Sequence, residues 1–472
     1  MLKESRKYRF GFFGHLSGTC ESYGNADFLL DWDKRIFGNL TLFIHREAQV
    51  QHWRGGERQV VIVGTIYSVG SKSVQAVVDE ILRSGADSIG PLLDGVSGRF
   101  ALFFSDGEIW RIYNDPFGSR SMFYSPEHRG VIASHAGIFA EVFNLPINPE
   151  TKKFMQSPVY QSRTVRYLPG DLTCWARVYA VVPNNYLDLS QAKLTRYWPV
   201  VPKRETTYEE FFEQFDCHVK GLLDAIRERY LLVGITGGID SRAVFAAMLK
   251  YGVPFNGVTW LGGYIDKKEM GTVGEIVKTF NIPHKKFSVS ADYSESIAKL
   301  ALLNSGSFRK PSSLVAKMHE HYGAKDGIFV RGYGGEIIRG FYNTFFKPLQ
   351  GFTPSEMMRT YGSSNRAEAV SDAYNKFGEK MFGYYIARGN YKDIEKFGFD
   401  CSDIFYWEHR MGMWGSAMLN EMDCAAYSLV GMNGRRLYET ALGLKPSERL
   451  SKKILARVVD DYDKKLSAIK YF

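Results

Sequence analysis

The sequence lacks the cysteine pattern of a disulfide framework or of a structural zinc site. Its five cysteines are odd in number, far apart and without a single CxxC pair. They are Cys20, Cys174, Cys217, Cys401 and Cys424. Disulfide scaffolds and zinc modules need cysteines paired at short, regular spacings. We therefore expect free thiols and no zinc module.

Long apolar runs and long runs of one charge are also missing. No apolar stretch reaches the ~18 residues that a membrane-spanning helix needs, and the start, MLKESRKYRF, lacks a signal-peptide core. The 60 basic and 51 acidic residues leave a formal charge of only +9, spread over 472 residues. These absences predict a soluble, cytoplasmic protein without a membrane partner, and they disfavour a nucleic-acid partner.

The sequence does contain a change of pattern near residue 205. Before it, short β-rich runs alternate with turn signals, and one helical stretch, SVQAVVDEILRSGA, interrupts them. After it, strands and helices alternate, as in LLVGI followed by SRAVFAAMLKYG, which is typical of a parallel sheet. Beyond Tyr342 the pattern is mostly helical. We predict an α+β domain of mainly antiparallel strands over residues 1–205. An α/β domain with a helical C-terminal part is predicted over residues 206–472.

A glycine-rich turn, GITGGIDS at residues 234–241, separates the first strand and helix of the second domain. Open parallel sheets bind ligands at the carboxyl ends of their strands, and N–H groups at a helix start suit phosphate. The turn has neither a Walker A ending nor GxGxxG spacing. Its hydroxyls add donors, and its carboxylate could hold Mg²⁺. The alternative is a tight turn that serves only close packing. The candidate ligand-binding residues are Thr236, Gly237, Gly238, Asp240 and Ser241.

The turn and six further stretches resemble, in order, the asparagine synthetase class. TGGIDS is similar to its SGGxDS pyrophosphate loop, and RGYGGE at 331–336 is similar to its GxGxD loop. VGMNGRRLYETALGL and SKKILARVV resemble two later stretches, and VVIVGTIYS, VSGRFALFFSD and NDPFGSRSMFY resemble the amidotransferase domain. The likeness is greatest to the β-lactam synthetase branch, which does not use glutamine. It implies an Ntn-hydrolase-like sandwich followed by a PP-loop ATP-pyrophosphatase domain.

The resemblance also implies a reaction and its cofactors, ATP and Mg²⁺. A substrate carboxylate is adenylated with release of pyrophosphate, and ammonia or an amine then displaces AMP. Gly332 and Gly334 would join the pyrophosphate loop in binding ATP, while Asp240 and Glu336 would hold the metal. Glu336 is one methylene longer than the family's aspartate. The family's catalytic lysine maps to Lys452, with Lys453 as the alternative.

Tyr333 matches a tyrosine that this branch pairs with a glutamate to deprotonate the attacking amine. A tyrosine, with a pKa of about 10, needs a carboxylate neighbour for such a role. The partner maps to Glu408, and Glu421 is the alternative; Tyr333 could also serve packing alone. Arg242 stands where the family often has a second serine. It could reach a phosphate or a substrate carboxylate, or it could form an ion pair on its helix.

The residues that hydrolyse glutamine in this class are absent from the first domain. Members that use glutamine have an N-terminal cysteine whose own amine activates the thiol. Here Phe10 aligns with that cysteine, and Val63 and Thr65 stand where NGEIYN has its Asn and acid. Cys20 would need a specific cleavage to become terminal. We predict that the domain keeps the fold without glutaminase activity.

Together these features favour an AMP-forming carbon–nitrogen ligase of a biosynthetic pathway. Its partners would be a small-molecule, peptide or sugar carboxylate and an amine donor, and the aromatic first domain would suit a homodimer. Two alternatives stay open. One is a PP-loop enzyme that modifies tRNA or another nucleic acid. The other is a non-catalytic binding or scaffold protein, which only the unusual Glu336 and Arg242 support.

Overall fold

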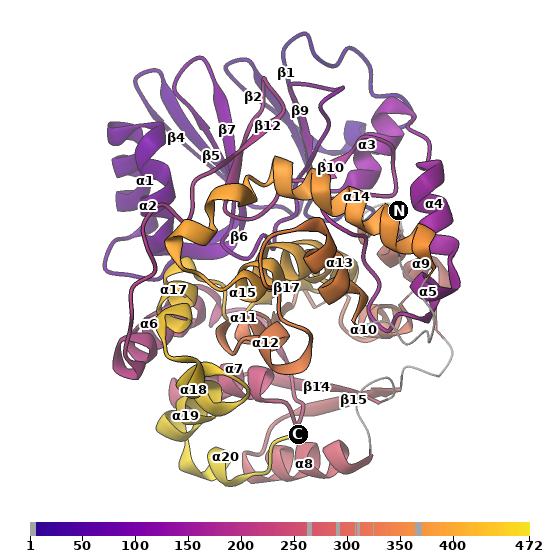
Figure 1. Cartoon of the computed structure of the whole chain (residues 1–472). Helices are drawn as coiled ribbons and strands as arrows, with labels where there is room; N and C mark the ends of the chain where they lie inside the picture. Colours follow the sequence, from indigo (N-terminus) through magenta and orange to yellow (C-terminus); the bar gives the residue numbers. More distant parts are fainter. Residues whose placement is uncertain are drawn as a thin grey trace.

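Three β-sheets organise the computed structural model, which describes residues 6–261, 267–288, 293–306, 308, 312–323, 325–363 and 371–472. Two are six-stranded and antiparallel and come from the first part of the chain; the third is five-stranded and parallel. In Figure 1 the antiparallel strands occupy the top of the view, and the parallel sheet with its helices lies below them. The mixed α/β architecture predicted from the sequence is confirmed at this level.

The first antiparallel sheet has the order β10-β8-β9-β1-β3-β2 and the second the order β12-β11-β7-β6-β5-β4. The strands of the first are β1 (Phe12–Leu16), β2 (Asp33–Phe37), β3 (Leu40–Ile44), β8 (Phe123–Tyr124), β9 (Val131–Ala133) and β10 (Tyr179–Ala180). Those of the second are β4 (Val50–Gly55), β5 (Arg58–Ser68), β6 (Val96–Ser105), β7 (Trp110–Asn114), β11 (Asn185–Asp188) and β12 (Lys193–Arg196).

The two antiparallel sheets pack face to face with helices outside them. Phe12 of β1 meets Phe103 of β6 edge-on, with ring centroids 5.4 Å apart. Because side chains alternate along a strand, β5 turns Val61 toward the other sheet and Ile62 toward α1 (Val74–Ser84) and α2 (Ile89–Leu92). Helix α3 (Ala136–Phe143) packs against the outer face of the first sheet. The two sheets and the helices on their outer faces form four layers, and the mainly antiparallel strands agree with the sequence-based prediction. The short helices α4 (Pro149–Gln156) and α5 (Pro158–Ser162) follow α3.

The parallel sheet has the order β15-β14-β13-β16-β17. Its strands are β13 (Leu231–Gly234), β14 (Asn256–Leu261), β15 (His284–Ser288), β16 (Ile328–Arg331) and β17 (Tyr427–Val430). The sequence did not predict β17, which lies in the part expected to be mostly helical. Helix α6 (Tyr208–Ile226) precedes β13, and the helices between β13 and β16 are α7 (Ile239–Lys250), α8 (Lys267–Thr279), α9 (Glu295–Asn304) and α10 (Ser313–Tyr322).

Helices cover both faces of the parallel sheet. Leu232 and Phe329 pack in a core shared with α9, α10 and α16 (Ser416–Met422), whereas Leu231 and Val330 face the core that contains α6, α7 and α19 (Lys453–Tyr462). The other C-terminal helices are α11 (Gly335–Ile338), α12 (Phe341–Phe345), α13 (Pro354–Gly362), α14 (Asp372–Arg388), α15 (Cys401–Phe405), the π-helix η7 (Tyr406–Gly415), α17 (Arg435–Gly443), α18 (Pro446–Arg449) and α20 (Lys464–Ala468). None of the described helices has the length and apolar character needed to cross a membrane.

A buried ion pair joins the two parts of the chain. Arg99 of β6 donates to both carboxylate oxygens of Asp423, at 2.6 and 2.7 Å, and neither side chain is exposed. Asn433 donates to the Gly98 carbonyl and to Asp115. Buried charges of this kind are tolerated only when they are paired and hydrogen-bonded. The antiparallel sandwich and the parallel sheet therefore share one continuous interior.

Candidate active site

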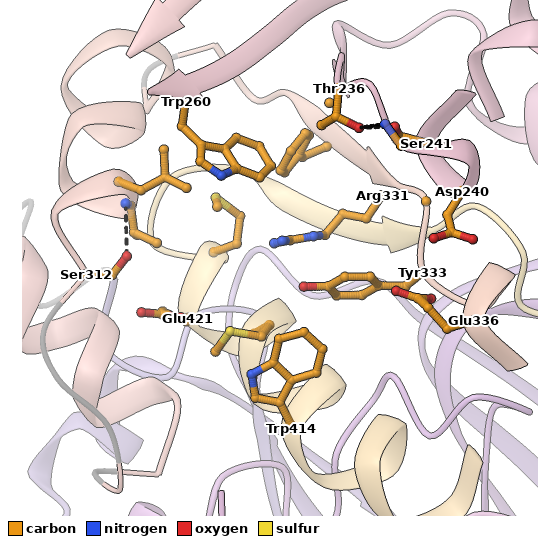
Figure 2. Close-up of a pocket in the computed structure, with 18 of the residues that line it drawn as sticks. Thr236, Asp240, Ser241, Trp260, Ser312, Arg331, Tyr333, Glu336, Trp414 and Glu421 are labelled. Atoms are coloured by element: carbon orange, nitrogen blue, oxygen red, sulfur yellow. Dashed lines mark hydrogen bonds between the residues drawn. The ribbon is translucent and has the colours of Figure 1, made fainter. Parts of the chain in front are cut away.

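A cavity of about 640 Å³ opens at the carboxyl ends of β13 and β16. Its walls carry side chains from the glycine-rich turn, from the loop after β16, from the end of η7 and from α16 (Figure 2). Of the predicted site residues, the cavity wall contains Thr236, Gly238, Asp240, Ser241, Gly332, Tyr333, Glu336 and Glu421. Parallel sheets place ligand sites at this end of their strands. The two loops that resemble the family are thus brought together.

The glycine-rich turn forms the start of helix α7. Strand β13 ends at Gly234, and Gly238 is the N-terminal cap residue, so the first N–H groups of α7 have no intrahelical partner. The Thr236 hydroxyl lies 2.7 Å from that of Ser241 and accepts the Gly238 N–H at 3.1 Å (Figure 2). This arrangement of hydroxyls and N–H groups suits an anion.

One N–H of the turn already binds a carboxylate. The Gly237 N–H donates to Glu269 Oε1 of α8 at 2.8 Å. A negatively charged oxygen therefore sits where a phosphate oxygen would be expected, which agrees with the anion preference of the turn. A phosphate at this N–H has to displace Glu269.

The loop after β16 can touch the turn only because it has glycines. A Cβ on Gly332 would lie 2.5 Å from the Ser241 nitrogen. Gly334 has φ +94°, and a Cβ there would lie 2.0 Å from the Met432 carbonyl oxygen. These close approaches explain both glycines by packing. Gly332 borders the cavity, whereas Gly237 and Gly334 are not among the residues that border it.

Asp240 and Glu336, the predicted metal ligands, both border the cavity. Arg339 donates to both oxygens of Asp240, at 2.7 and 2.9 Å. Burial, and then the charge of Asp240, raise the pKa of Glu336 to about 7. Oε2 of Glu336 is buried and has no hydrogen-bond partner.

This donor set fits a Mg²⁺ ion that is carried by phosphates. In such sites Mg²⁺ takes one or two protein carboxylates and keeps substrate oxygens and water as its other ligands. The described residues contain no group of three or more His, Cys, Asp or Glu side chains placed for a metal. Glu336 Oε2 has no hydrogen-bond partner and could coordinate the ion directly. Asp240 would have to bind the ion in addition to Arg339, or give up its hydrogen bonds from Arg339.

Tyr333 stands in an aromatic frame at the centre of the wall. Its ring is parallel to Phe117 at 6.3 Å, tilted to Trp414 at 5.7 Å, and covered by the Arg331 guanidinium at 4.5 Å. Figure 2 shows its hydroxyl pointing into the cavity, with Glu421 of α16 on the same cavity wall. The frame fixes the ring, so packing and a chemical role of the hydroxyl are both compatible with this position.

The structure does not place Glu408, the predicted partner of Tyr333, among the residues that border the cavity. Glu408 lies on η7, fully buried, and accepts two hydrogen bonds from Arg196, at 2.7 and 2.8 Å, and one from Asn184. Both of its oxygens are thus committed outside the cavity. The alternative, Glu421, borders the cavity together with Tyr333, as Asp240 and Glu336 also do.

Neither predicted lysine borders the cavity among the described residues. Lys452 is the residue before α19, and the exposed Lys453 donates to the Ser447 carbonyl. Three arginines that were not predicted as site residues border the cavity instead: Arg163, Arg166 and Arg331. A signal for Arg331 was available, because it directly precedes the GYGGE loop.

Arg242 binds the C-terminal residues of the chain, a role that the sequence did not predict. It donates to the carbonyls of Ile469 and Lys470, and its guanidinium lies 4.1 Å from the ring centroid of Tyr471. The Phe472 N–H in turn donates to the Gly237 carbonyl at 2.9 Å. Arg242 therefore ties residues 469–472 to the back of the glycine-rich turn, and neither a ligand contact nor an ion pair is needed to explain it.

No protein-family model and no curated protein matches the chain. Solved structures with some likeness include NMN synthetase from Francisella tularensis, 14% identical over 44% of this chain and 94% of that chain, with a TM-score of 0.22. Glutamine phosphoribosylpyrophosphate amidotransferase from B. subtilis is 12% identical over 70% of each chain, with a TM-score of 0.25. A glutamine-dependent NAD+ synthetase from Acinetobacter baumannii is 11% identical over 69% and 62%, with a TM-score of 0.17. Likenesses of this size do not assign a function.

Proposed function

We propose that the protein is an AMP-forming carbon–nitrogen ligase that activates a carboxylate with ATP and joins it to ammonia or an amine. One observation carries this proposal: the glycine-rich turn, the acid Glu336 and the pair Tyr333 and Glu421 border the same cavity. A phosphate cradle, a metal ligand and a base relay are the three parts that such a reaction needs.

The turn is proposed to hold the phosphates of ATP. The Thr236 and Ser241 hydroxyls and the N–H groups at the start of α7 can donate to the departing pyrophosphate, where negative charge builds up. Bound Mg²⁺ would neutralise part of that charge, and Asp240 and Glu336 are the side chains that would hold it. Glu269 leaves the Gly237 N–H when phosphate arrives.

The substrate carboxylate is proposed to lie beside Arg331. A carboxylate oxygen attacks the α-phosphorus, the bond to the bridging oxygen of the β-phosphate breaks, and pyrophosphate leaves with the electron pair. The Arg331 guanidinium lies 5.3 Å from the ring centroid of Phe329 and 4.5 Å from that of Tyr333. Its guanidinium points into the cavity in Figure 2 and can bind the attacking carboxylate or the α-phosphate.

The amine is proposed to enter on the side of Tyr333 and Glu421. The amine nitrogen attacks the acyl carbon, the bond to the AMP oxygen breaks, and AMP leaves with the electron pair. The proton of the amine passes through the Tyr333 hydroxyl to the Glu421 carboxylate, because the tyrosine alone is too weak a base at neutral pH. No glutamine is consumed, since Phe10 aligns with the nucleophile of the glutamine-using enzymes.

A non-catalytic binding protein is the second candidate. Two observations favour it. Arg339 donates a hydrogen bond to the Asp240 carboxylate, and the Glu269 carboxylate accepts the Gly237 N–H. In such a protein both contacts would be permanent, and Mg-ATP would not bind.

Nucleotide product analysis separates the two candidates. The protein and its Asp240→Asn variant are incubated with Mg-ATP and a metabolite extract, and AMP and pyrophosphate are measured. AMP and pyrophosphate from the wild type alone support the ligase, and fractionating the extract then leads to the acid. ADP in place of AMP contradicts it. Failure of Mg-ATP to bind in a calorimetric titration supports the second candidate.

A further inference from the structure

The glycine-rich turn has a front that faces the cavity and a back that does not. On the front, the residues that border the cavity are Thr236, Gly238 and Ser241. At the back, a Cβ on Gly237 would lie 2.9 Å from Cγ of Glu269 and 3.0 Å from Cδ2 of Phe472. Figure 1 shows this end of the chain close to α8, the helix that carries Glu269. The back of the turn is therefore held by parts of the chain that do not themselves border the cavity.

The carbonyl of Gly237 is fixed at this back side. It accepts the Phe472 N–H at 2.9 Å, and Nη2 of Arg242 lies 3.4 Å from the same oxygen. The peptide bond between Gly237 and Gly238 is trans, so its C=O and its N–H point in opposite directions. With the carbonyl tied to the back, the Gly238 N–H points to the front, where the Thr236 hydroxyl accepts it at 3.1 Å.

The direction of this peptide decides what the turn can bind. N–H groups at the start of a helix attract phosphate, whereas a carbonyl oxygen in the same place would repel it. Gly237 and Gly238 flank the peptide, and glycine adopts positive and negative φ about equally readily. The two glycines by themselves therefore permit the peptide to flip and to present its carbonyl to the cavity. A contact from outside the turn is needed to hold one direction.

Arg242 anchors the segment that supplies this contact. It lies near the start of α7 and is 0% exposed. Its guanidinium donates to the carbonyls of Ile469 and Lys470 and lies 4.1 Å from the ring centroid of Tyr471. One side chain thus contacts the three consecutive residues before Phe472 and fixes where the Phe472 N–H lies. The anchor belongs to the same helix whose first N–H groups form the proposed phosphate cradle.

We propose that Arg242 is a positioning residue. Through residues 469–472 it holds the Gly237 carbonyl at the back of the turn, and this keeps the Gly238 N–H directed at the phosphates of ATP. Arg242 acts without touching the nucleotide, since it is not among the residues that border the cavity. The inference rests on the ligase function proposed above, because that function assigns the phosphates to this turn.

Two variants of Phe472 separate the effect of its N–H from that of its ring. Phe472→Pro removes the N–H, because proline has none, whereas Phe472→Ala keeps the N–H and removes the ring. Calorimetric titration of each variant of the full chain with Mg-ATP measures the affinity. Phe472→Pro should bind about tenfold more weakly than the wild type, because a phosphate loses a charge-assisted hydrogen bond. Phe472→Ala, the matched control, should bind Mg-ATP much as the wild type does.

Two variants of Arg242 test the anchor. Arg242→Met keeps much of the length of the side chain but none of its donors, so we expect the same loss of about tenfold. Arg242→Lys retains a cation that can donate to the carbonyls of Ile469 and Lys470, and it should recover most of the affinity. A residue that only stabilised the fold would lower the melting temperature and leave the Mg-ATP affinity of the folded protein unchanged.

Equal Mg-ATP affinities of Phe472→Pro and Phe472→Ala would overturn the inference and leave the ligase function standing. If the wild type itself does not bind Mg-ATP, the ligase function fails, and the positioning role fails with it. Thermal melts show whether the Arg242 variants fold. If Arg242→Met does not fold, the two Phe472 variants still decide the outcome, because they leave the Arg242 side chain in place.

Discussion

Arg339 and Asp240 form a two-pronged ion pair at the rim of the cavity, with N–O distances of 2.7 and 2.9 Å. The Arg339 guanidinium binds the same carboxylate that is proposed to hold the metal. Glu336, whose Oε2 has no hydrogen-bond partner, lies next to this pair. Arg339 thus neutralises an acid pair that would otherwise repel itself. A divalent cation can take over the same task, because it supplies positive charge to both carboxylates.

Replacing Arg339 with Gln should make the stability of the protein depend on Mg²⁺. Without the guanidinium, two neighbouring carboxylates remain inside the wall, and the loss of one partner of a largely buried pair costs about 3 kcal/mol. Thermal melts with and without MgCl₂ measure the effect: the variant should lose stability without the metal and recover much of it with the metal. Equal recovery in wild type and variant would argue against a cation site here.

Tyr333 and Glu421 should affect the second half of the reaction more than the first. Tyr333→Phe and Glu421→Gln remove the proposed proton path, so amide formation should slow by about 10²- to 10⁴-fold. Exchange of labelled pyrophosphate into ATP, which reports adenylation, should persist. Glu408→Gln is the matched control: it should lower stability by about 3–5 kcal/mol, because Arg196 loses its buried partner. Equal loss of exchange and amide formation in the Tyr333 variant would remove the relay.

Arg331 should matter for activity where Lys452 does not. Arg331→Gln deletes a cation that points into the cavity, so we expect kcat/KM to fall about 10- to 100-fold, roughly 1.4–2.7 kcal/mol of transition-state stabilisation. Arg331→Lys should recover only part of this, because a point charge cannot replace a bidentate fork. Lys452→Gln should change little. The reverse ranking would restore the lysine that the resemblance implied.

Much of the sandwich could be predicted from the sequence because its central strands are strongly apolar. The runs that contain β5 and β6 are buried at most positions and read plainly as strands. Strand β2, with four exposed residues in DKRIF, and β4, with VQHWRG, carry edge patterns that local propensity does not distinguish from loops. Strand β17 was missed because only its place beside β16, and not its four residues, makes it part of the sheet.

The site was predictable where a loop carries its own signal. The loops GITGGIDS and GYGGE can be recognised from their glycines. The close packing of Gly332 on Ser241 shows why a glycine is needed there. The partner of Tyr333 could not be chosen from the sequence, because Glu408 lies on the π-helix η7 and Glu421 on the α-helix that follows it, and the wider π-helical turns change which side chains face the cavity.

The imidazole of His409 should make the protein sensitive to acid. His409 is fully buried on η7 and stacks on Phe405 at 4.7 Å, and burial lowers its pKa to about 3. The unfolded chain has the ordinary histidine pKa of about 6.5 and therefore binds this proton at a higher pH than the folded protein. The stability contributed by the neutral ring is complete above about pH 6.5 and is lost as the pH falls toward 3, at about 1.4 kcal/mol per pH unit. His409→Phe keeps the stacking without the titration, so its stability relative to wild type should rise steadily from pH 7 to 4 in urea-unfolding experiments. His52→Phe, on the exposed edge strand β4, is the control and should show no such trend. A constant difference between wild type and His409→Phe across this range would mean that the ring accepts a proton within the fold.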